Sequence, residues 1–384
     1  MRFYFQTGHV FSDDAYYSYL SYTMLNGNFT ADYLGYPVFP LRFAFIGLTS
    51  LSMEIFGITE SATLIFPFIF SVLNIVLTYK LSRLFTENYR VALFAAFLMA
   101  FFPTDVIFST IAFPDLINVF FINLGIYFLL KSYFQKKNYW AFIGGISFFL
   151  SMQFKENIYN TSILLIILFT YFLAQRRQLN PQLFIGLLFI ATNFLTEGFA
   201  YLLLHNDFLD RITETNINYN YSYYDFFPYT AQELSTSKNY LRNLFDQIFL
   251  INAKSIFFRR FYLFLPIVAA IQAYSGLRKK EHTLLVYWFV GTVILLIGFT
   301  TSFIEYKPLD LSRSWYIYPV LMPMIILAAT FINRFSGLIR NGLIVIYVLG
   351  SLIMCFEYEN FFDKENLNQF KSFLRKNPSK MIYT

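Results

Sequence analysis

Long apolar stretches alternate with short polar connections along most of the chain. Each stretch approaches the roughly 17 to 25 residues with which an α-helix crosses the hydrocarbon core of a bilayer. We therefore expect ten membrane crossings, at residues 62–80, 91–110, 114–130, 139–154, 157–174, 183–204, 261–277, 284–301, 317–333 and 338–356. The pattern predicts an all-α polytopic membrane protein.

The expected crossings fall into two blocks. Six lie within residues 62–204 and four within residues 261–356, and a large loop rich in Tyr and Asn, residues 205–260, separates the blocks. Residues 1–61 form an outer loop with juxtamembrane helices and an acidic motif, and residues 357–384 form an outer tail. These boundaries define the predicted domain organisation.

The composition supports a bilayer environment. Hydrophobic residues make up 57% of the 384 residues, with 51 Phe and 30 Tyr, which is far more than a soluble core needs. The single cysteine, Cys355, excludes an intramolecular disulfide and a thiolate metal cluster. The net charge of +6 reflects basic loops of a membrane protein, so we expect the lipid bilayer and no nucleic acid as a partner.

The basic loops indicate the orientation of the chain. Five clusters lie between the expected crossings: Lys80, Arg83 and Arg90; Lys131, Lys136 and Lys137; Arg176 and Arg177; Arg278, Lys279 and Lys280; Arg334 and Arg340. If the first crossing enters from outside, all five clusters lie on the cytoplasmic side, as the positive-inside rule requires. The loops at the other end then face outward.

This orientation requires that the apolar segment 38–57 does not cross the membrane. The segment contains Pro40, Arg42 and Glu54, and charges at membrane depth are costly unless they face a cavity. We interpret it as a helix in the outer interface, where Arg42 and Glu54 snorkel or support the surface. Because residues 1–61 then lie outside, we expect a transmembrane helix upstream of Met1.

An acidic stretch precedes this segment. Asp13 and Asp14 are followed by Tyr16, Tyr17, Leu20, Thr23, Met24 and Leu25, which are spaced like one apolar face of a short helix. Gly27 would end that helix. The two carboxylates would therefore lie at the start of an amphipathic helix near the membrane surface.

Three strings in this region resemble the first outer loop of the GT-C membrane glycosyltransferases. They are Asp13-Asp14-x-x-Tyr17, Met24-Leu25-x-Gly27 and Tyr36-Pro37-x-x-Pro40-Leu41. The closest likeness is to the protein O-mannosyltransferase and aminoarabinose-transferase group, whose members use a polyprenyl-phosphate sugar. Their acidic pair is usually Asp-Glu, so Asp13 matches the catalytic Asp and Asp14 replaces the Glu with a shorter arm.

Later segments extend the resemblance. Pro114-Asp115 looks like the second acidic position of the family, and Phe154-Lys155-Glu156 lies where the family often has a Thr-Lys that meets the lipid phosphate. Trp315-Tyr316-x-x-Pro319-x-x-x-Pro323 is similar to a family segment that begins with Arg, for which Arg313 substitutes. The resemblance covers residues 12–175 well and residues 305–330 loosely.

The resemblance implies an inverting glycosyltransferase in the cell membrane, with its active site on the extracytoplasmic face. The sugar would pass from a polyprenyl-phosphate donor to a protein, lipid or glycan acceptor. The implied roles are catalysis by Asp13, Asp14 and Asp115, donor phosphate binding by Lys155 and Arg313, and substrate binding by Tyr17, Tyr36, Glu156 and Tyr316. A divalent cation, Mg²⁺ or Mn²⁺, would be held by Asp13 and Asp115.

Simpler interpretations of these residues remain open. Acidic residues favour the first turn of any helix, which also accounts for Asp13 and Asp14. Asp115 after Pro114 is an ordinary helix start, and Lys155 beside Glu156 is compatible with a local ion pair. At the level of function, a transporter also explains intramembrane charges, and a polysaccharide polymerase or ligase or a non-catalytic scaffold are further alternatives.

Overall fold

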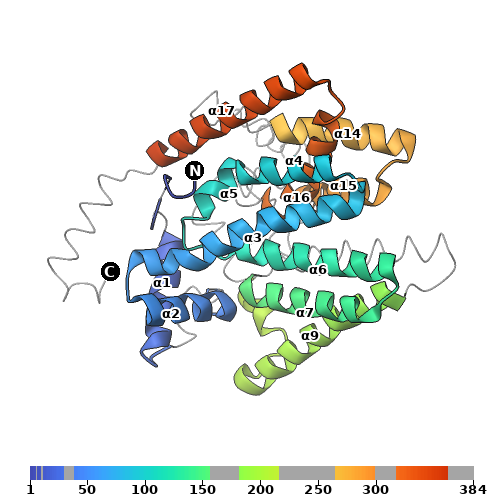
Figure 1. Ribbon diagram of the computed structural model, residues 1–384. Coiled ribbons are helices and arrows are strands. Elements are labelled where there is room, and N and C mark those ends of the chain that lie inside the picture. The colour runs from blue at the N-terminus through green and yellow to red at the C-terminus, as the bar shows by residue number, and fades with distance from the viewer. Residues whose placement is uncertain are drawn as a thin grey trace, which may run out of the picture.

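The computed structural model describes residues 1–29 except 6, 10 and 11, and residues 39–155, 181–215, 264–298 and 317–361. Within these ranges the regular elements are helices, which confirms the predicted all-α class. They are α1 (Ser12–Leu25), α2 (Phe43–Phe56), α3 (Glu60–Thr86), α4 (Tyr89–Ala100), α5 (Pro103–Phe108), α6 (Asp115–Gln135), α7 (Asn138–Phe154), α9 (Pro181–His205), α14 (Phe264–Lys279), α15 (Thr283–Gly298), α16 (Tyr318–Ile332) and α17 (Gly337–Phe361) (Figure 1).

Four of the described helices are long and apolar enough to cross a membrane. These candidate spans are Glu60–Thr86, Asp115–Gln135, Phe184–Leu203 and Gly337–Glu357. Shorter apolar helices, including α16, lie beside them. The chain is therefore a multi-pass membrane protein, as the apolar pattern predicts, whereas the expected crossing at 157–174 lies outside the described residues.

The apolar run at 91–110 differs from the expected single crossing. It is divided into α4, which ends at Ala100, and the short helix α5, which begins at Pro103. Proline has no backbone N–H and its ring clashes with the preceding turn, and the residue before it favours an extended backbone. Phe102 has this extended conformation, with φ −67° and ψ 117°, so the helix breaks there.

The two short helices before α3 lie at one end of the bundle (Figure 1). Helix α1 ends before Gly27, whose φ of +69° lies in the left-handed region that favours glycine, as the sequence predicts. Helix α2 packs against α1, α3 and α7. The position of both helices relative to a membrane surface stays a prediction.

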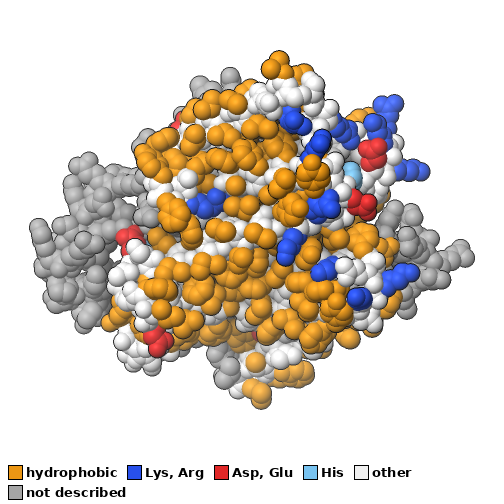
Figure 2. All heavy atoms as spheres, in the orientation of Figure 1, with side chains coloured by type: hydrophobic (Ala, Val, Ile, Leu, Met, Phe, Trp, Pro, Cys, Tyr) orange, Lys and Arg blue, Asp and Glu red, His pale blue; other side chains and the backbone are white. Residues whose placement is uncertain are grey.

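Basic side chains gather at the opposite end of the bundle (Figure 2). Lys80 and Arg83 lie near the end of α3, Lys131 lies near the end of α6, and Lys137 is the N-cap of α7. Arg278 and Lys279 lie in the last turn of α14. Arg334, which follows α16, pairs with Glu281, which follows α14. The described residues thus bring four of the five basic clusters to the side that we predict to be cytoplasmic, and the fifth, Arg176 and Arg177, lies outside them.

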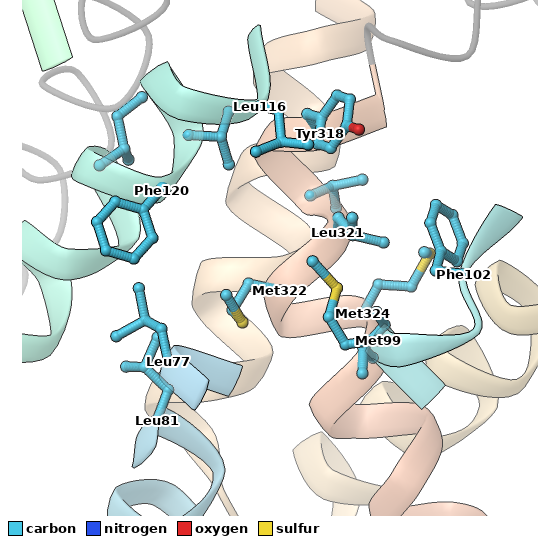
Figure 3. Packing of buried hydrophobic residues seen from close by; sticks show 14 of the residues in the cluster. Leu77, Leu81, Met99, Phe102, Leu116, Phe120, Tyr318, Leu321, Met322 and Met324 are labelled. Carbon is cyan, nitrogen blue, oxygen red and sulfur yellow. The ribbon is translucent and has the colours of Figure 1, made fainter. Parts of the chain in front are cut away.

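Apolar packing in the middle of the bundle centres on α16, which is buried along nearly its whole length. Side chains from α3, α4 and α6 surround it (Figure 3). The buried contacts include Leu77, Met99, Leu116, Leu321 and Met322. Because lipid is as apolar as these side chains, close van der Waals packing rather than exclusion of water holds such helices together.

Helices α6 and α7 approach each other closely through small residues. A Cβ atom added at Gly144 would lie 3.1 Å from the carbonyl oxygen of Gly125. Small residues at such positions let two backbones come near one another in a membrane. Since the two helices are antiparallel neighbours in the bundle, this packing also brings the start of α6 near the end of α7 (Figure 1).

The distribution of charge predicts which residues can be labelled from outside the cell. The native Cys355 is buried, so the wild-type protein should react little with an impermeant thiol reagent. A cysteine at the exposed position Asn28, after α1, should react in intact cells, whereas a cysteine at the exposed position Lys279 should react only in opened cells. The measurement is mass-tag labelling, and the reverse pattern would invert the orientation.

Candidate functional site

A buried ion pair joins the start of α6 to the end of α7. Lys155 Nζ lies 2.7 Å from Asp115 Oδ1 and 2.8 Å from Asp115 Oδ2. The side chains of Lys155 and Asp115 are only 5% and 1% exposed. A single ammonium group thus binds both oxygens of a carboxylate where little water can reach them. The structure brings these two predicted site residues together.

The local backbone explains why Lys155 reaches Asp115. Helix α7 ends at Phe154, and Lys155 is extended with φ −166° and ψ 156°. Asn118, in the first turn of α6, donates through Nδ2 to the carbonyl oxygens of Ser151 at 2.7 Å and Lys155 at 2.9 Å. The backbone N–H of Lys155 also donates to the carbonyl oxygen of Ser151 at 3.1 Å, so the Asn118 amide adds a second hydrogen bond there and supplies the Lys155 carbonyl with a donor after the helix has ended. The Asn118 amide therefore fixes the end of α7 against the start of α6.

The acidic helix α1 contributes the other predicted carboxylates. Asp13 and Asp14 lie in its first turn, where the helix dipole favours negative charge. Asp13 is half-buried and Asp14 is fully buried. The Asp14 Oδ1 atom accepts a hydrogen bond from the backbone N–H of Ala15 at 2.8 Å. Asp13 is therefore the more accessible of the two carboxylates.

Aromatic contacts connect α1 with the ion pair. The Tyr17 ring packs edge-on against the Phe113 ring, with centroids 6.4 Å apart, and Lys155 Nζ lies 5.4 Å from the centroid of the same Phe113 ring. Residues four apart on a helix share a face, so Asp13 lies one turn from Tyr17. Tyr17, Phe113, Lys155 and Asp115 thus form one continuous group, and Asp13 lies on the same face of α1 as Tyr17, one turn before it.

Arg42 differs from its predicted role as an interfacial side chain. It is buried rather than snorkelling, it donates through Nη1 to the hydroxyl of Tyr17, and its guanidinium lies 5.3 Å from the centroid of the Phe39 ring. Glu54 is exposed, in keeping with a surface role. The sequence did not reveal the burial of Arg42 because the stabilising partner, Tyr17, lies 25 positions away.

A second buried cation, Arg211, was not predicted from the sequence pattern. Its Nη2 atom lies 2.7 Å from Glu197 Oε1 and donates to the carbonyl oxygen of Leu41 at 2.8 Å, and its Nη1 atom donates to that of Met152 at 3.2 Å. Arg211 thus ties the residue before Arg42 to the last turn of α7. Glu197 was the detectable signal, because an ionisable residue within an apolar run marks a functional or structural pair.

Tyr36, Glu156, Arg313 and Tyr316 lie outside the described residues, so their roles in substrate and phosphate binding stay predictions.

The described residues do not fit the predicted divalent cation. They contain no group of three His, Cys, Asp or Glu side chains that could hold a metal ion. Both oxygens of Asp115, one of the two predicted ligands, are bound to Lys155. An ammonium in that position would repel a second cation. Asp115 therefore acts as the counter-charge of Lys155 in this arrangement.

The buried pair should show strong coupling in a double-mutant cycle. Asp115→Asn and Lys155→Gln should each cost about 3 to 5 kcal/mol, because each leaves one buried charge without its partner. The double variant should be more stable than the sum of the two losses predicts. Thermal unfolding in detergent measures this, and additive losses would show that the two charges do not stabilise each other.

Replacement of Arg211 by Gln should destabilise the protein more than the equivalent change at Arg334. Arg211 is buried and also donates to two backbone carbonyls, whereas the Arg334–Glu281 pair, 3.3 Å apart, is 37% and 49% exposed. Exposed pairs contribute about 0 to 1 kcal/mol. The readout is the apparent melting temperature, and equal shifts would contradict a structural role for Arg211.

Comparison with known proteins agrees with this architecture. Residues 40–197 match the family model described as dolichyl-phosphate-mannose-protein mannosyltransferase, and no curated protein matches the chain. The apo oligosaccharyltransferase of Archaeoglobus fulgidus superimposes with a TM-score of 0.59 and 17% identity, over 92% of this chain and 52% of that one. Its complex with an inhibitory peptide and a dolichol-phosphate gives 0.56 and 16%, over the same shares of 92% and 52%.

Another solved structure, that of ArnT, has the same fold. Apo ArnT from Cupriavidus metallidurans superimposes with a TM-score of 0.54 and 14% identity, over 86% of this chain and 57% of that one. The chain therefore spans about half the length of the solved structures that it matches. At this level of identity the likeness shows the fold. The chain has the fold of the GT-C membrane glycosyltransferases.

Proposed function

We propose that the protein transfers a sugar from a polyprenyl-phosphate donor to an acceptor at the end of the bundle that carries α1. The observation that carries this proposal is the buried Asp115–Lys155 pair beside the acidic helix. The matched family is described by its use of a dolichyl-phosphate sugar, and one structure with the same fold binds a dolichol-phosphate. Both findings support a lipid phosphate as the leaving group.

Lys155 is suited to bind that phosphate. A lysine ammonium has three N–H donors, and the two oxygens of Asp115 account for two contacts of Nζ. Among the residues that the structure describes, the third donor has no other hydrogen-bond acceptor, so it can meet a phosphate oxygen. Negative charge develops on the phosphate as the glycosidic bond breaks, and a fixed cation where little water can enter stabilises that charge strongly. Asp115 holds the ammonium in place before the donor arrives.

Asp13 is suited to act on the acceptor. In the proposed reaction the bond between the anomeric carbon and the phosphate oxygen breaks, and its electron pair stays on the lipid phosphate. The acceptor oxygen forms a new bond to the anomeric carbon from the opposite side, so the configuration inverts. The proton of the acceptor passes to the carboxylate of Asp13, which acts as general base. Asp14, which is buried, would support the position of Asp13.

The predicted metal ion has no assigned step in this proposal. One structure with the same fold is a complex with Zn and sulfate. A divalent cation would supply charge for the departing phosphate. In the described part of this chain, Lys155 donates to both carboxylate oxygens of Asp115. The reaction above uses only the side chains of the protein.

The proposed reaction faces the extracytoplasmic side of the cell membrane. This assignment rests on the basic residues at the opposite end of the bundle and on the positive-inside rule (Figure 2). The acceptor is a protein, a lipid or a glycan that is available at that surface. Mass spectrometry of lipid-linked and surface glycans, with and without the protein, would identify the sugar and the acceptor.

Replacement of Asp13 by Asn should abolish sugar transfer while the protein stays folded. The amide keeps the shape of the side chain and cannot take up a proton from the acceptor. The matched control is Glu54→Gln, which removes an exposed carboxylate from α2 and should leave the rate unchanged. Transfer from a polyprenyl-phosphate sugar in reconstituted vesicles measures both. Unchanged turnover in Asp13→Asn would exclude Asp13 from the mechanism.

A further inference from the structure

Three lysines from three different helices meet at the basic end of the bundle. Lys80 lies on α3, Lys131 lies on α6 and Lys137 caps the start of α7. Lys80 and Lys137 are both close enough to repel the charge of Lys131. Among the described residues, no carboxylate forms an ion pair with any of the three; the buried and exposed pairs involve Arg2, Lys155, Arg211 and Arg334 instead.

Aromatic side chains fix the central lysine. Lys131 Nζ lies 3.5 Å from the centroid of the Trp140 ring and 5.7 Å from that of Tyr127. Trp140 stacks on Phe128 with centroids 5.2 Å apart, and its Nε1 donates to Gln135 Oε1 at 3.0 Å. These contacts hold the ammonium in a defined place against the repulsion of its neighbours. A fixed group of like charges lowers its energy by binding an anion.

The surroundings favour a lipid over a soluble anion. Lys131 lies near the end of the candidate span Asp115–Gln135, where the hydrocarbon meets the headgroup region. Trp and Tyr are typical of this depth. Large apolar side chains near the end of α6 and the start of α7 are exposed, namely Phe134, Tyr139 and Phe142 at 52%, 51% and 50%. They offer contacts for acyl chains, which a free phosphate cannot use.

We propose that Lys80, Lys131 and Lys137 bind the phosphate headgroup of an anionic phospholipid at the cytoplasmic end of the bundle. The lipid would link α3, α6 and α7 by charge at the end where the described residues offer these lysines no counter-charge. Helices α6 and α7 carry Asp115 and Lys155 at their other ends, so the bound lipid stabilises the helix pair that forms the candidate site. The proposal of this lipid-binding site does not depend on the proposed transferase activity.

The test is lipid binding by the purified full-length chain. Native mass spectrometry should show that phosphatidylglycerol binds more tightly than phosphatidylcholine. Lys131→Gln should weaken phosphatidylglycerol binding about fivefold, because a lysine near a charged membrane surface contributes about 1 kcal/mol. The matched control is Lys279→Gln, which removes the same charge from the same end of the bundle but lies on α14, and it should leave this affinity nearly unchanged.

Two further measurements distinguish this site from general attraction. Trp140→Leu keeps every charge, and by releasing Lys131 it should also weaken phosphatidylglycerol binding, while the melting temperature in phosphatidylcholine shows whether the variant is folded. If Lys137→Gln, Lys131→Gln and Lys279→Gln all weaken binding equally, the charge of the whole face suffices and the proposed site does not exist. Equal affinity for phosphatidylcholine, or displacement of the lipid by inorganic phosphate at similar concentrations, would also overturn it.

Discussion

A charge that is removed from water needs an opposite charge or hydrogen-bonding partners, and the pair of Asp115 and Lys155 shows how this constraint shapes the protein. The desolvation of each ion costs several kcal/mol, and their attraction offsets that cost only in close geometry. Lys155 lies within 2.8 Å of both oxygens of Asp115. The geometry depends on the close approach of α6 and α7 at Gly125 and Gly144. Glycines inside the membrane helices thus determine where the charges of the site lie.

Two other buried pairs follow the same rule and join distant parts of the chain. Arg2 Nη2 lies 2.6 Å from Asp105 Oδ2, and Arg211 Nη2 lies 2.7 Å from Glu197 Oε1. Arg2 connects the first residues to α5, and Arg211 connects the segment after α9 to α2 and α7. A buried cation that also donates to backbone carbonyls stabilises one arrangement of segments over its alternatives. Buried ion pairs between distant segments of the chain therefore stabilise the arrangement of these segments.

The sequence predicted those features that depend on local pattern. The apolar runs predicted the helices, and Gly27 predicted the end of α1. Asp13 and Asp14 predicted the acidic first turn of the same helix. The break at Pro103 could also have been predicted, because it follows from the chemistry of proline alone.

Features that depend on packing between distant residues could not be predicted in this way. Arg42 is buried because the hydroxyl of Tyr17 accepts its hydrogen bond, and Arg211 is buried because Glu197 and two carbonyl oxygens surround it. Neither contact can be predicted from the spacing of residues along the sequence. A basic residue in an outer loop is expected to be exposed until its partner is known. Lys155 could be predicted because the family has a lysine at the corresponding position, whereas Arg42 and Arg211 had no such motif.

The two ends of the bundle differ in how their charged side chains are accommodated. At the end that carries α1, cations such as Lys155 have carboxylate partners from other helices and are buried. At the other end, Lys80 and Lys137 are exposed and Lys131 rests on the indole of Trp140. Paired charges can be held in a rigid, water-poor site, which electrostatic catalysis needs. Exposed basic charges stay at the surface and, by the positive-inside rule, favour the cytoplasmic side of a membrane. The same helices, α6 and α7, extend between both ends, so the packing that orients them in the membrane also aligns the buried pair.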